Sequence, residues 1–306
     1  MTFRAAFIAG PTASGKSAAA LNVAEALGGE IVNADAMQVY ADLNVLTARP
    51  PAEDLARAPH HLYGVLDGDE RCSAGRWARM AAAVIADIQG RGRLPVIVGG
   101  TGLYFRALAE GLSPVPEAPL EVRAAAKERL AHLGREAFYA EVIAQDPEMA
   151  RLHINDTQRL LRAWEVYEVA GAPLSAYQSM PPEPLLTGAI FKIVLEPHRD
   201  ALYANCNKRF DAMLENGALE EVRALAARGL EGDKPVMKSL GAPELMAVLK
   251  GERTLEAAAA AAKMATRRFA KRQMTWFRGQ AGDWARASAS DAAADAVISA
   301  VKTGSA

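Results

Sequence analysis

Short apolar runs separated by helical patterns characterise the first 112 residues. Residues 5–9 and 94–100 are almost continuously apolar, which predicts parallel strands that are buried on both faces. Residues 30–33 indicate a further strand, and residues 63–66 are a candidate for another. Apolar positions recur with helical spacing in the segments between these strands, at 18–27 and 77–89. This alternation predicts an α/β fold with a parallel sheet flanked by helices.

The pattern changes at residue 113, where prolines precede long helical stretches. No strand pattern returns before residues 190–195. Helices that interrupt the alternation in this way predict an inserted helical lobe, closed by the proline-rich segment 181–184. The helices expected in it span 120–133, 136–144 and 157–170. We therefore expect a core in two parts, 1–112 and 186–306, around an insertion at 113–185.

The last third is predicted to be mainly helical, with helices at 199–215, 219–228 and 254–277. The second half of the last helix holds the densest basic run of the chain, with aromatic residues interleaved. This run is either a solvated helix face or a contact for a nucleic-acid backbone, with the aromatic residues packing the other side. Beyond residue 287 the chain is rich in Ala, Ser and Asp, and we expect that tail to be peripheral.

Composition narrows the class of protein. The 306 residues carry a net charge of −1 and are 51% hydrophobic, as in a soluble globular protein, so any nucleic-acid surface must come from local clustering of basic residues. Cys72 and Cys206 lack metal-ligand spacing and are expected to be plain thiols in a reducing compartment. Without a membrane-length apolar run or a signal peptide, the expectation is a cytoplasmic enzyme that makes no membrane contact.

Residues 10–17, Gly-Pro-Thr-Ala-Ser-Gly-Lys-Ser, lie between a predicted strand and a predicted helix, which is the arrangement of a phosphate-binding P-loop. Gly10 and Gly15 allow backbone N–H groups to turn towards an anion, and the helix N-terminus adds positive potential. Lys16 supplies a charge for phosphate oxygens, and the Ser17 hydroxyl can bind Mg²⁺. The alternative is a Gly-rich turn that matches by chance. A nucleotide is the usual occupant, but a pyrophosphate on another carrier would fit the same loop.

Three further polar residues follow predicted strands, at the edge of the sheet where ligands bind in open α/β folds. Asp35 is a candidate Mg²⁺ ligand, general base or helix N-cap. Gln38 has a donor and an acceptor that suit the edge of an adenine. Thr101, within Gly-Gly-Thr-Gly, either caps the next helix or presents its hydroxyl to a substrate. The adjacent His60 and His61 point to opposite sides of an extended chain and are expected to be structural.

Six segments, in this order and over nearly the whole chain, resemble the tRNA dimethylallyltransferase (tRNA isopentenyltransferase) family in its short bacterial form. They are Gly-Pro-Thr-Ala-Ser-Gly-Lys-Ser at 10–17, Asp-Ala-Met-Gln-Val-Tyr at 35–40, Thr-Ala-Arg-Pro at 47–50, Val-Gly-Gly-Thr-Gly-Leu-Tyr at 98–104, Asp-Thr-Gln-Arg-Leu-Leu-Arg-Ala at 156–163 and Ala-Lys-Arg-Gln-Met-Thr-Trp-Phe at 270–277.

The resemblance implies Mg²⁺-dependent transfer of a dimethylallyl group from dimethylallyl diphosphate to the N6 amine of the adenosine next to the anticodon on its 3′ side. The P-loop would then hold the donor diphosphate through Gly10, Pro11, Thr12, Ala13, Ser14, Gly15, Lys16 and Ser17. Loops of this kind are also commonly described as ATP-binding. Arg209 would clamp the diphosphate, and Asp35 would accept a proton from the amine that Thr101 orients. The adenine would have to flip out of its stack to reach the site.

The same resemblance implies that this protein binds the anticodon stem-loop of tRNA. We separately expect a monomer. The residues that the resemblance assigns to tRNA are Asp35, Ala36, Met37, Gln38, Thr101, Arg123, Gln158, Arg159, Leu160, Leu161, Arg162, Arg268 and Arg272. Two departures stand out: Ala36 replaces the usual Ser, and Ala242-Pro243 replaces an aromatic and a basic residue.

Three other functions fit parts of the pattern. A P-loop kinase or NTPase that acts on a small metabolite shares the loop, Mg²⁺ and a nearby Asp, but does not need the basic helix. A prenyltransferase acting on free adenine nucleotides could dispense with both the insertion and that helix. A non-catalytic RNA-binding protein would leave the P-loop unexplained.

Overall fold

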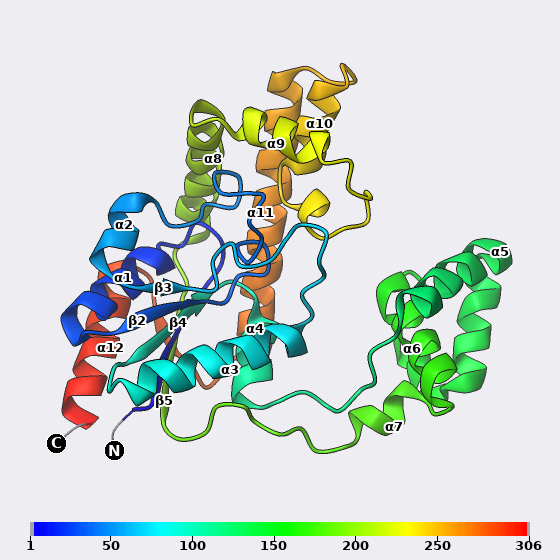
Figure 1. Ribbon diagram of the computed structural model, residues 1–306, viewed down its shortest axis with the longest axis horizontal. Coiled ribbons are helices and arrows are strands. Elements are labelled where there is room, and N and C mark those ends of the chain that lie inside the picture. Colours follow the sequence, from blue (N-terminus) through cyan, green and yellow to red (C-terminus); the bar gives the residue numbers. More distant parts are fainter. Residues whose placement is uncertain (1–2, 305–306) are drawn as a thin grey trace. The chain divides into compact units, whose positions relative to one another are not determined.

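Residues 3–304, which the computed structural model describes, contain one six-stranded sheet in which every neighbouring pair is parallel (Figure 1). The strand order is β3-β2-β4-β1-β5-β6. The strands are β1 (Ala5–Ala9), β2 (Glu30–Asn33), β3 (His60–His61), β4 (Pro95–Gly99), β5 (Ile190–Leu195) and β6 (Ala285–Ala287). The α/β fold with a parallel sheet flanked by helices is thus confirmed.

The apolar run of β1 is continuous because both faces of the sheet are covered. Ala6 and Ile8 belong to a core cluster with α1 (Lys16–Leu27) on one face. Phe7 points to the other face, where its ring lies 5.2 Å from Phe105 of α4 (Gly102–Ala109) and 5.9 Å from Trp284. Side chains of a strand alternate between faces, so a strand enclosed on both sides has no polar positions to offer.

The expectation of a peripheral tail is wrong. Residues Ser290–Gly304 form α12, and Ala293, Ala294 and Val297 are buried in the same core cluster as α1 and the sheet. Small side chains on one stripe allow this helix to lie close to its neighbours. A composition rich in Ala therefore indicated a tightly packed helix here.

The strand considered at residues 63–66 is also wrong, since β3 is confined to His60–His61. The next residue, Leu62, adopts a left-handed conformation with φ of 64°, which extended backbone does not tolerate. The chain then turns, and Leu66 makes an isolated parallel bridge with Tyr40.

Six further helices lie outside residues 110–184. They are α2 (Ala52–Arg57), α3 (Ala74–Gly90), α8 (Arg199–Glu215), α9 (Ala218–Ala227), α10 (Ala242–Leu249) and α11 (Leu255–Gln280). The one expected at 199–215 is confirmed. The long α11 begins after Thr254, whose side chain accepts a hydrogen bond from the Ala257 N–H at 3.2 Å. Thr is a favoured residue at this position because it satisfies a free helix N–H group.

The chain divides into two compact units, one of them formed by residues 110–184 and the other by the flanking segments. The smaller unit contains α5 (Leu120–Gln145), α6 (Thr157–Ala170) and α7 (Leu174–Gln178) around its own core, which includes Phe138 and Trp164. The helices expected at 120–133 and 136–144 are joined as α5, with a break at Gly134, where φ is 76°.

Within residues 3–304, no helix combines the length and the apolar composition that crossing a bilayer requires. Cys72 and Cys206 are both free thiols. The same residues contain no cluster of three or more His, Cys, Asp or Glu side chains suited to a metal ion.

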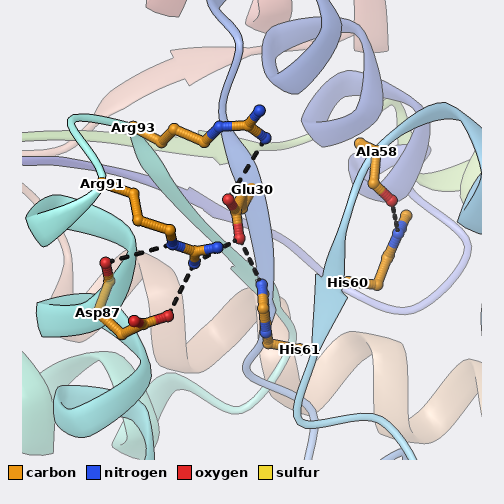
Figure 2. Close-up of polar contacts among 7 residues, drawn as sticks. All are labelled: Glu30, Ala58, His60, His61, Asp87, Arg91 and Arg93. Atoms are coloured by element: carbon orange, nitrogen blue, oxygen red, sulfur yellow. Dashed lines mark hydrogen bonds and ion pairs between the residues drawn. The ribbon is translucent and has the colours of Figure 1, made fainter.

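Glu30, a buried carboxylate, stands at the amino end of β2 (Figure 2). The Asp35 loop follows the other end of this strand. Glu30 is 1% exposed, and its oxygens lie 2.7 Å from His61 Nε2, 3.0 Å from Arg91 and 3.4 Å from Arg93. Burial by itself raises the pKa of Glu30, but the bonds from His61 and Arg91 outweigh it, so the pKa lies below its ordinary value. The paired His residues are structural, as the sequence predicts: His61 holds Glu30, and His60 Nδ1 lies 2.8 Å from the Ala58 carbonyl oxygen.

We expect Glu30→Gln to lower the free energy of unfolding by about 1–3 kcal/mol at pH 7, because charge-assisted bonds to a buried group are removed. A carboxyl whose folded pKa is depressed contributes stability above its unfolded pKa, near 4.5, and loses it as the pH falls through the folded value. The difference from wild type, measured by urea denaturation, should therefore shrink at pH 4. Glu25→Gln, which disrupts an exposed pair with Arg57, should stay near wild type. An equal difference at both pH values would contradict the assigned role of Glu30.

Candidate functional site

The carboxyl ends of β1, β2 and β4 surround a cavity of about 620 Å³. Most of the P-loop, Asp35, Gln38 and Arg209 line it, so the sequence-predicted donor residues and part of the acceptor set share one space. The lining residues are Thr12, Ala13, Ser14, Gly15, Lys16, Ser17, Asp35, Gln38, Thr47, Ala48, Arg49, Pro51, Tyr63, Val98, Gly99, Asn205, Lys208 and Arg209.

The P-loop has the geometry of an anion cradle. Gly15 turns the chain into α1 with φ of 88°, a left-handed conformation that Gly adopts without strain. The first peptide N–H groups of α1 lack helical partners and give this end of the helix positive potential. Among the described residues, the Ser14 hydroxyl is buried without a hydrogen-bond partner although Ser14 lines the cavity.

Helix α8 brings further cationic groups to the same cavity. Asn205, Lys208 and Arg209 are spaced i, i+3 and i+4, so they lie on one face of the helix. Arg209 donates a hydrogen bond to the Thr12 hydroxyl of the P-loop. With Lys16 and Arg49, the cavity has four basic side chains and the single carboxylate of Asp35. Such an imbalance attracts an anion.

This environment lowers the pKa of Lys16 from 10.5 to about 8. Burial is the main cause, because a low-dielectric surrounding disfavours the ammonium ion. Arg209 also lowers the value and Asp35 opposes the shift. The Lys16 Nζ donates to the Pro11 carbonyl oxygen at 3.1 Å, so the side chain is held within its own loop.

Asp35 is positioned by a turn after β2. Its N–H donates to Asn33 Oδ1 at 2.8 Å, and its Oδ1 accepts the Met37 N–H at 2.9 Å. The carboxylate thus caps a turn rather than a helix, while it also lines the cavity. The Ala36 N–H donates to Thr101 Oγ1 at 3.0 Å, which connects this turn to the loop after β4. Thr101 itself lies beside the cavity lining rather than in it.

Gln38 has its amide group already oriented. The Nε2 atom donates to the carbonyl oxygens of Thr47 and Ala48, at 2.9 and 2.7 Å. Both N–H groups are thereby used, so only the Oε1 acceptor faces a ligand. Whereas the sequence suggests a donor and an acceptor for an adenine edge, the folded chain offers the acceptor.

Gln273 of α11 connects two loops of the site. It is 6% exposed, its Oε1 accepts the Thr12 N–H at 2.8 Å, and its Nε2 donates to the Gly100 carbonyl oxygen at 2.9 Å. A Cβ at residue 100 would collide with the Gln273 amide, so a larger residue there would displace that amide from its hydrogen bonds.

Several residues of this site were not assigned from the sequence, among them Arg49, Asn205, Lys208 and Gln273. The spacing of Asn205 and Lys208 relative to Arg209 was a usable signal. Gln273 also had one, because it is a polar residue within the buried stripe of α11 beside Ala270, Met274 and Phe277.

The residues assigned to tRNA on α5 and α6 belong to the smaller unit. Gln158 and Arg159 are exposed, whereas Leu160 is 2% exposed and packs in the core of that unit. Arg162 donates to the Pro116 carbonyl oxygen at 2.6 Å. The remaining two, Arg123 in the first turn of α5 and Leu161 on α6, are half-buried.

On α11, the basic residues differ in their environment. Lys263 pairs with Asp211, and Arg267 donates to Asn207 Oδ1 at 2.6 Å, so both are committed to α8. Arg268 and Arg272 are exposed, the latter over the Phe269 ring at 5.5 Å. Only part of the basic run is therefore available to a partner.

The parallel sheet and the P-loop define a P-loop protein, and the charge of its cavity suits an anion. Comparison with known proteins is more specific. The sequence profile described as "IPP transferase" matches residues 38–280, and one described as "Isopentenyl transferase" matches residues 3–63. This chain belongs to the IPP transferase family.

Named relatives agree with that assignment. The chain is 55% identical to a tRNA dimethylallyltransferase of Parvibaculum lavamentivorans over 92% of its length and 90% of that relative. It is 54% identical to one of Phenylobacterium zucineum, over 93% and 92%. Among solved structures, the tRNA isopentenylpyrophosphate transferase of Bacillus halodurans matches with a TM-score of 0.69 and 31% identity, over 97% of this chain and 95% of that one. A eukaryotic dimethylallyltransferase acting on tRNA matches with a TM-score of 0.73 and 27% identity, over 89% and 69%.

The lowered pKa of Lys16 gives a pH-dependent affinity for anions. Below about pH 8 the ammonium form of Lys16 predominates, and the affinity for pyrophosphate should be highest there. The Kd for pyrophosphate should rise as the pH increases above that value. Calorimetric titration with inorganic pyrophosphate between pH 7 and 9.5 would measure this. Lys16→Arg, which stays charged throughout, controls for the titration of pyrophosphate itself. Parallel curves for both proteins would show that Lys16 does not titrate in this range.

Proposed function

We propose that this protein transfers a dimethylallyl group from dimethylallyl diphosphate to the N6 amine of a tRNA adenosine, the one next to the anticodon on its 3′ side. The observation that carries the proposal is the shared cavity: a P-loop and Arg209 for a diphosphate lie in the same space as the Asp35 carboxylate. Relatives about half identical over most of the chain are tRNA dimethylallyltransferases, which favours this reaction over phosphoryl transfer.

The donor side of the cavity suits a diphosphate leaving group. As the bond between the prenyl C1 and the diphosphate oxygen breaks, negative charge grows on the diphosphate. Lys16, Arg209 and the P-loop N–H groups are already fixed around that position, so they stabilise the charge without reorganising. Placing the prenyl diphosphate rather than a nucleotide in the P-loop also leaves the rest of the cavity for the acceptor.

The acceptor side supplies a base and an orienting group. The N6 amine forms a bond to C1, and the proton it loses goes to the Asp35 carboxylate, whose Oδ1 is held by the Met37 N–H. Thr101, whose hydroxyl accepts the Ala36 N–H beside this cavity, would orient the amine, and Gln38 Oε1 would accept a hydrogen bond from it. An adenine within a stacked loop cannot reach these groups, so it has to be flipped out.

A magnesium ion fits this donor set. The Ser17 hydroxyl offers a hard oxygen ligand in the cavity, and Mg²⁺ commonly completes its shell with phosphate oxygens and water. When bound, the ion would neutralise charge on the diphosphate.

Each of the two units has its own set of exposed residues that this proposal assigns to tRNA. Arg268 and Arg272 on α11 are exposed to contact phosphates, and so are Gln158 and Arg159 on α6. Leu160 is buried, so it would act indirectly, by holding in place α6, the helix that carries Gln158 and Arg159. Contacts of this kind make binding depend on salt concentration.

A transfer assay tests the proposed function. Purified protein is incubated with Mg²⁺, radiolabelled dimethylallyl diphosphate and either unmodified tRNA or AMP, with an ATP hydrolysis assay in parallel. Label on tRNA alone is the expected result. Label on AMP alone would indicate a prenyltransferase for free nucleotides, and ATP consumption without transfer would indicate a kinase or NTPase.

Asp35→Asn should lower kcat by about 10²–10⁴-fold, the usual contribution of a general base. The amide keeps an oxygen for the Met37 N–H, so the turn survives and tRNA affinity should change little. Single-turnover transfer and a filter-binding Kd measure the two effects. Glu53→Gln, an exposed carboxylate on α2, serves as the matched control and should behave as wild type. Near-normal turnover of Asp35→Asn would exclude the assigned role.

Arg268→Ala combined with Arg272→Ala should weaken tRNA binding and reduce the slope of log Kd against log salt by about 2, one unit for each phosphate that is no longer neutralised. A control that removes the same charge elsewhere, Arg79→Ala with Lys302→Ala on α3 and α12, should keep the wild-type slope. Binding titrations from about 50 to 200 mM salt would check this, because phosphate-dominated affinity falls steeply over that range. An unchanged slope in the α11 variant would assign those arginines to plain solvated surface.

A further inference from the structure

We infer that Gln273 is a positioning residue that sets the separation between the donor loop and the acceptor loop in the active site. This inference rests on the proposed function, because it assigns the two loops to two substrates. Gln273 is not among the residues that line the cavity, so it acts through the backbone of the loops rather than by touching a substrate.

The two loops have adjacent origins in the sheet. β1 and β4 are paired in parallel, with Ala9 opposite Gly99, so the P-loop and the Gly99–Gly100 turn leave the sheet side by side. The pairing of adjacent strands fixes where the two loops start. It does not fix how far the loops diverge beyond the last hydrogen bond between the strands. The Gln273 amide spans the two loops at Thr12 and Gly100, with bonds of 2.8 and 2.9 Å.

A single side chain between the two loops must form a hydrogen bond with one backbone donor and one backbone acceptor. The Thr12 N–H needs an acceptor, and the Gly100 carbonyl needs a donor. A primary amide offers both at fixed separation, and burial makes either unmet group costly. The same demand determines which way the amide faces: Oε1 to Thr12 and Nε2 to Gly100.

Each loop then passes this constraint to groups of the proposed reaction. The Thr12 hydroxyl accepts from Arg209, the clamp for the donor diphosphate. Thr101 follows Gly100 directly and holds the Ala36 N–H, next to Asp35. Gln273 therefore ties the residues that hold the leaving group to those that orient the amine. Misplacement of reacting groups by about 1 Å can cost on the order of 100-fold in rate.

Two substitutions of similar shape separate positioning from mere packing. Gln273→Met keeps the volume and removes both hydrogen bonds. Gln273→Glu keeps an acceptor for the Thr12 N–H, but an ionised carboxylate repels the Gly100 carbonyl oxygen. When protonated, the same carboxyl group donates to that oxygen and reproduces both bonds of glutamine. Gln280→Glu, an exposed position on the same helix, is the matched control.

The experiment measures kcat for prenyl transfer to tRNA between pH 6 and 8.5, with Kd for tRNA and for inorganic pyrophosphate and a thermal unfolding curve for each protein. At pH 8 both Gln273 variants should lose about 10–100-fold in kcat, with each Kd within about threefold of wild type. As the pH falls, Gln273→Glu should recover relative to wild type, whereas Gln273→Met and Gln280→Glu should keep a constant ratio.

The outcomes separate this inference from the proposed function. A wild-type protein that prenylates no tRNA would refute the function. An active wild type with Gln273 variants of normal kcat, or with a Gln273→Glu to wild-type ratio that does not vary with pH, would refute the positioning role. If Gln273→Met fails to fold, the pH profile of Gln273→Glu decides alone.

Discussion

The buried amide of Gln273 and its two hydrogen bonds are the constraint on which the arrangement of the site depends. The parallel sheet brings the loops after β1 and β4 to the same edge, and the amide fixes them to each other beyond the sheet. Because Gly100 has no side chain, α11 can approach closely enough for the bond to form. A side chain 261 residues further along the chain from Thr12 thus completes the P-loop.

The cavity has an excess of positive charge that an anionic substrate would compensate. Four basic side chains face one carboxylate, and burial has already lowered the pKa of Lys16 to about 8. Burial, followed by the nearby Asp35 charge, also raises the pKa of the Tyr63 phenol, which therefore stays protonated in this wall. An anionic diphosphate would compensate the positive charge, so binding and the protonation of Lys16 favour each other.

Basic side chains outside the cavity fall into two groups, those that bond to neighbouring elements and those that are exposed. On α11, Lys263 and Arg267 are bound to α8 and stabilise the packing of the two helices, whereas Arg268 and Arg272 face solvent. The smaller unit repeats this division, with Arg162 bound to the Pro116 carbonyl and Arg159 exposed. A near-neutral chain can in this way present local basic surfaces for a polyanion without a large overall charge.

Sequence analysis alone predicts the α/β class, the P-loop and the family, because periodicity and contiguous motifs are local properties. It also placed Asp35 and Gln38 correctly at the edge of the sheet that holds the P-loop. The folded chain was needed to show that Gln38 offers an acceptor alone, that α12 packs in the core, and that Arg49, Lys208 and Gln273 belong to the site. These facts depend on which backbone groups and helices meet across long separations in sequence, and no local pattern of residues encodes those partners.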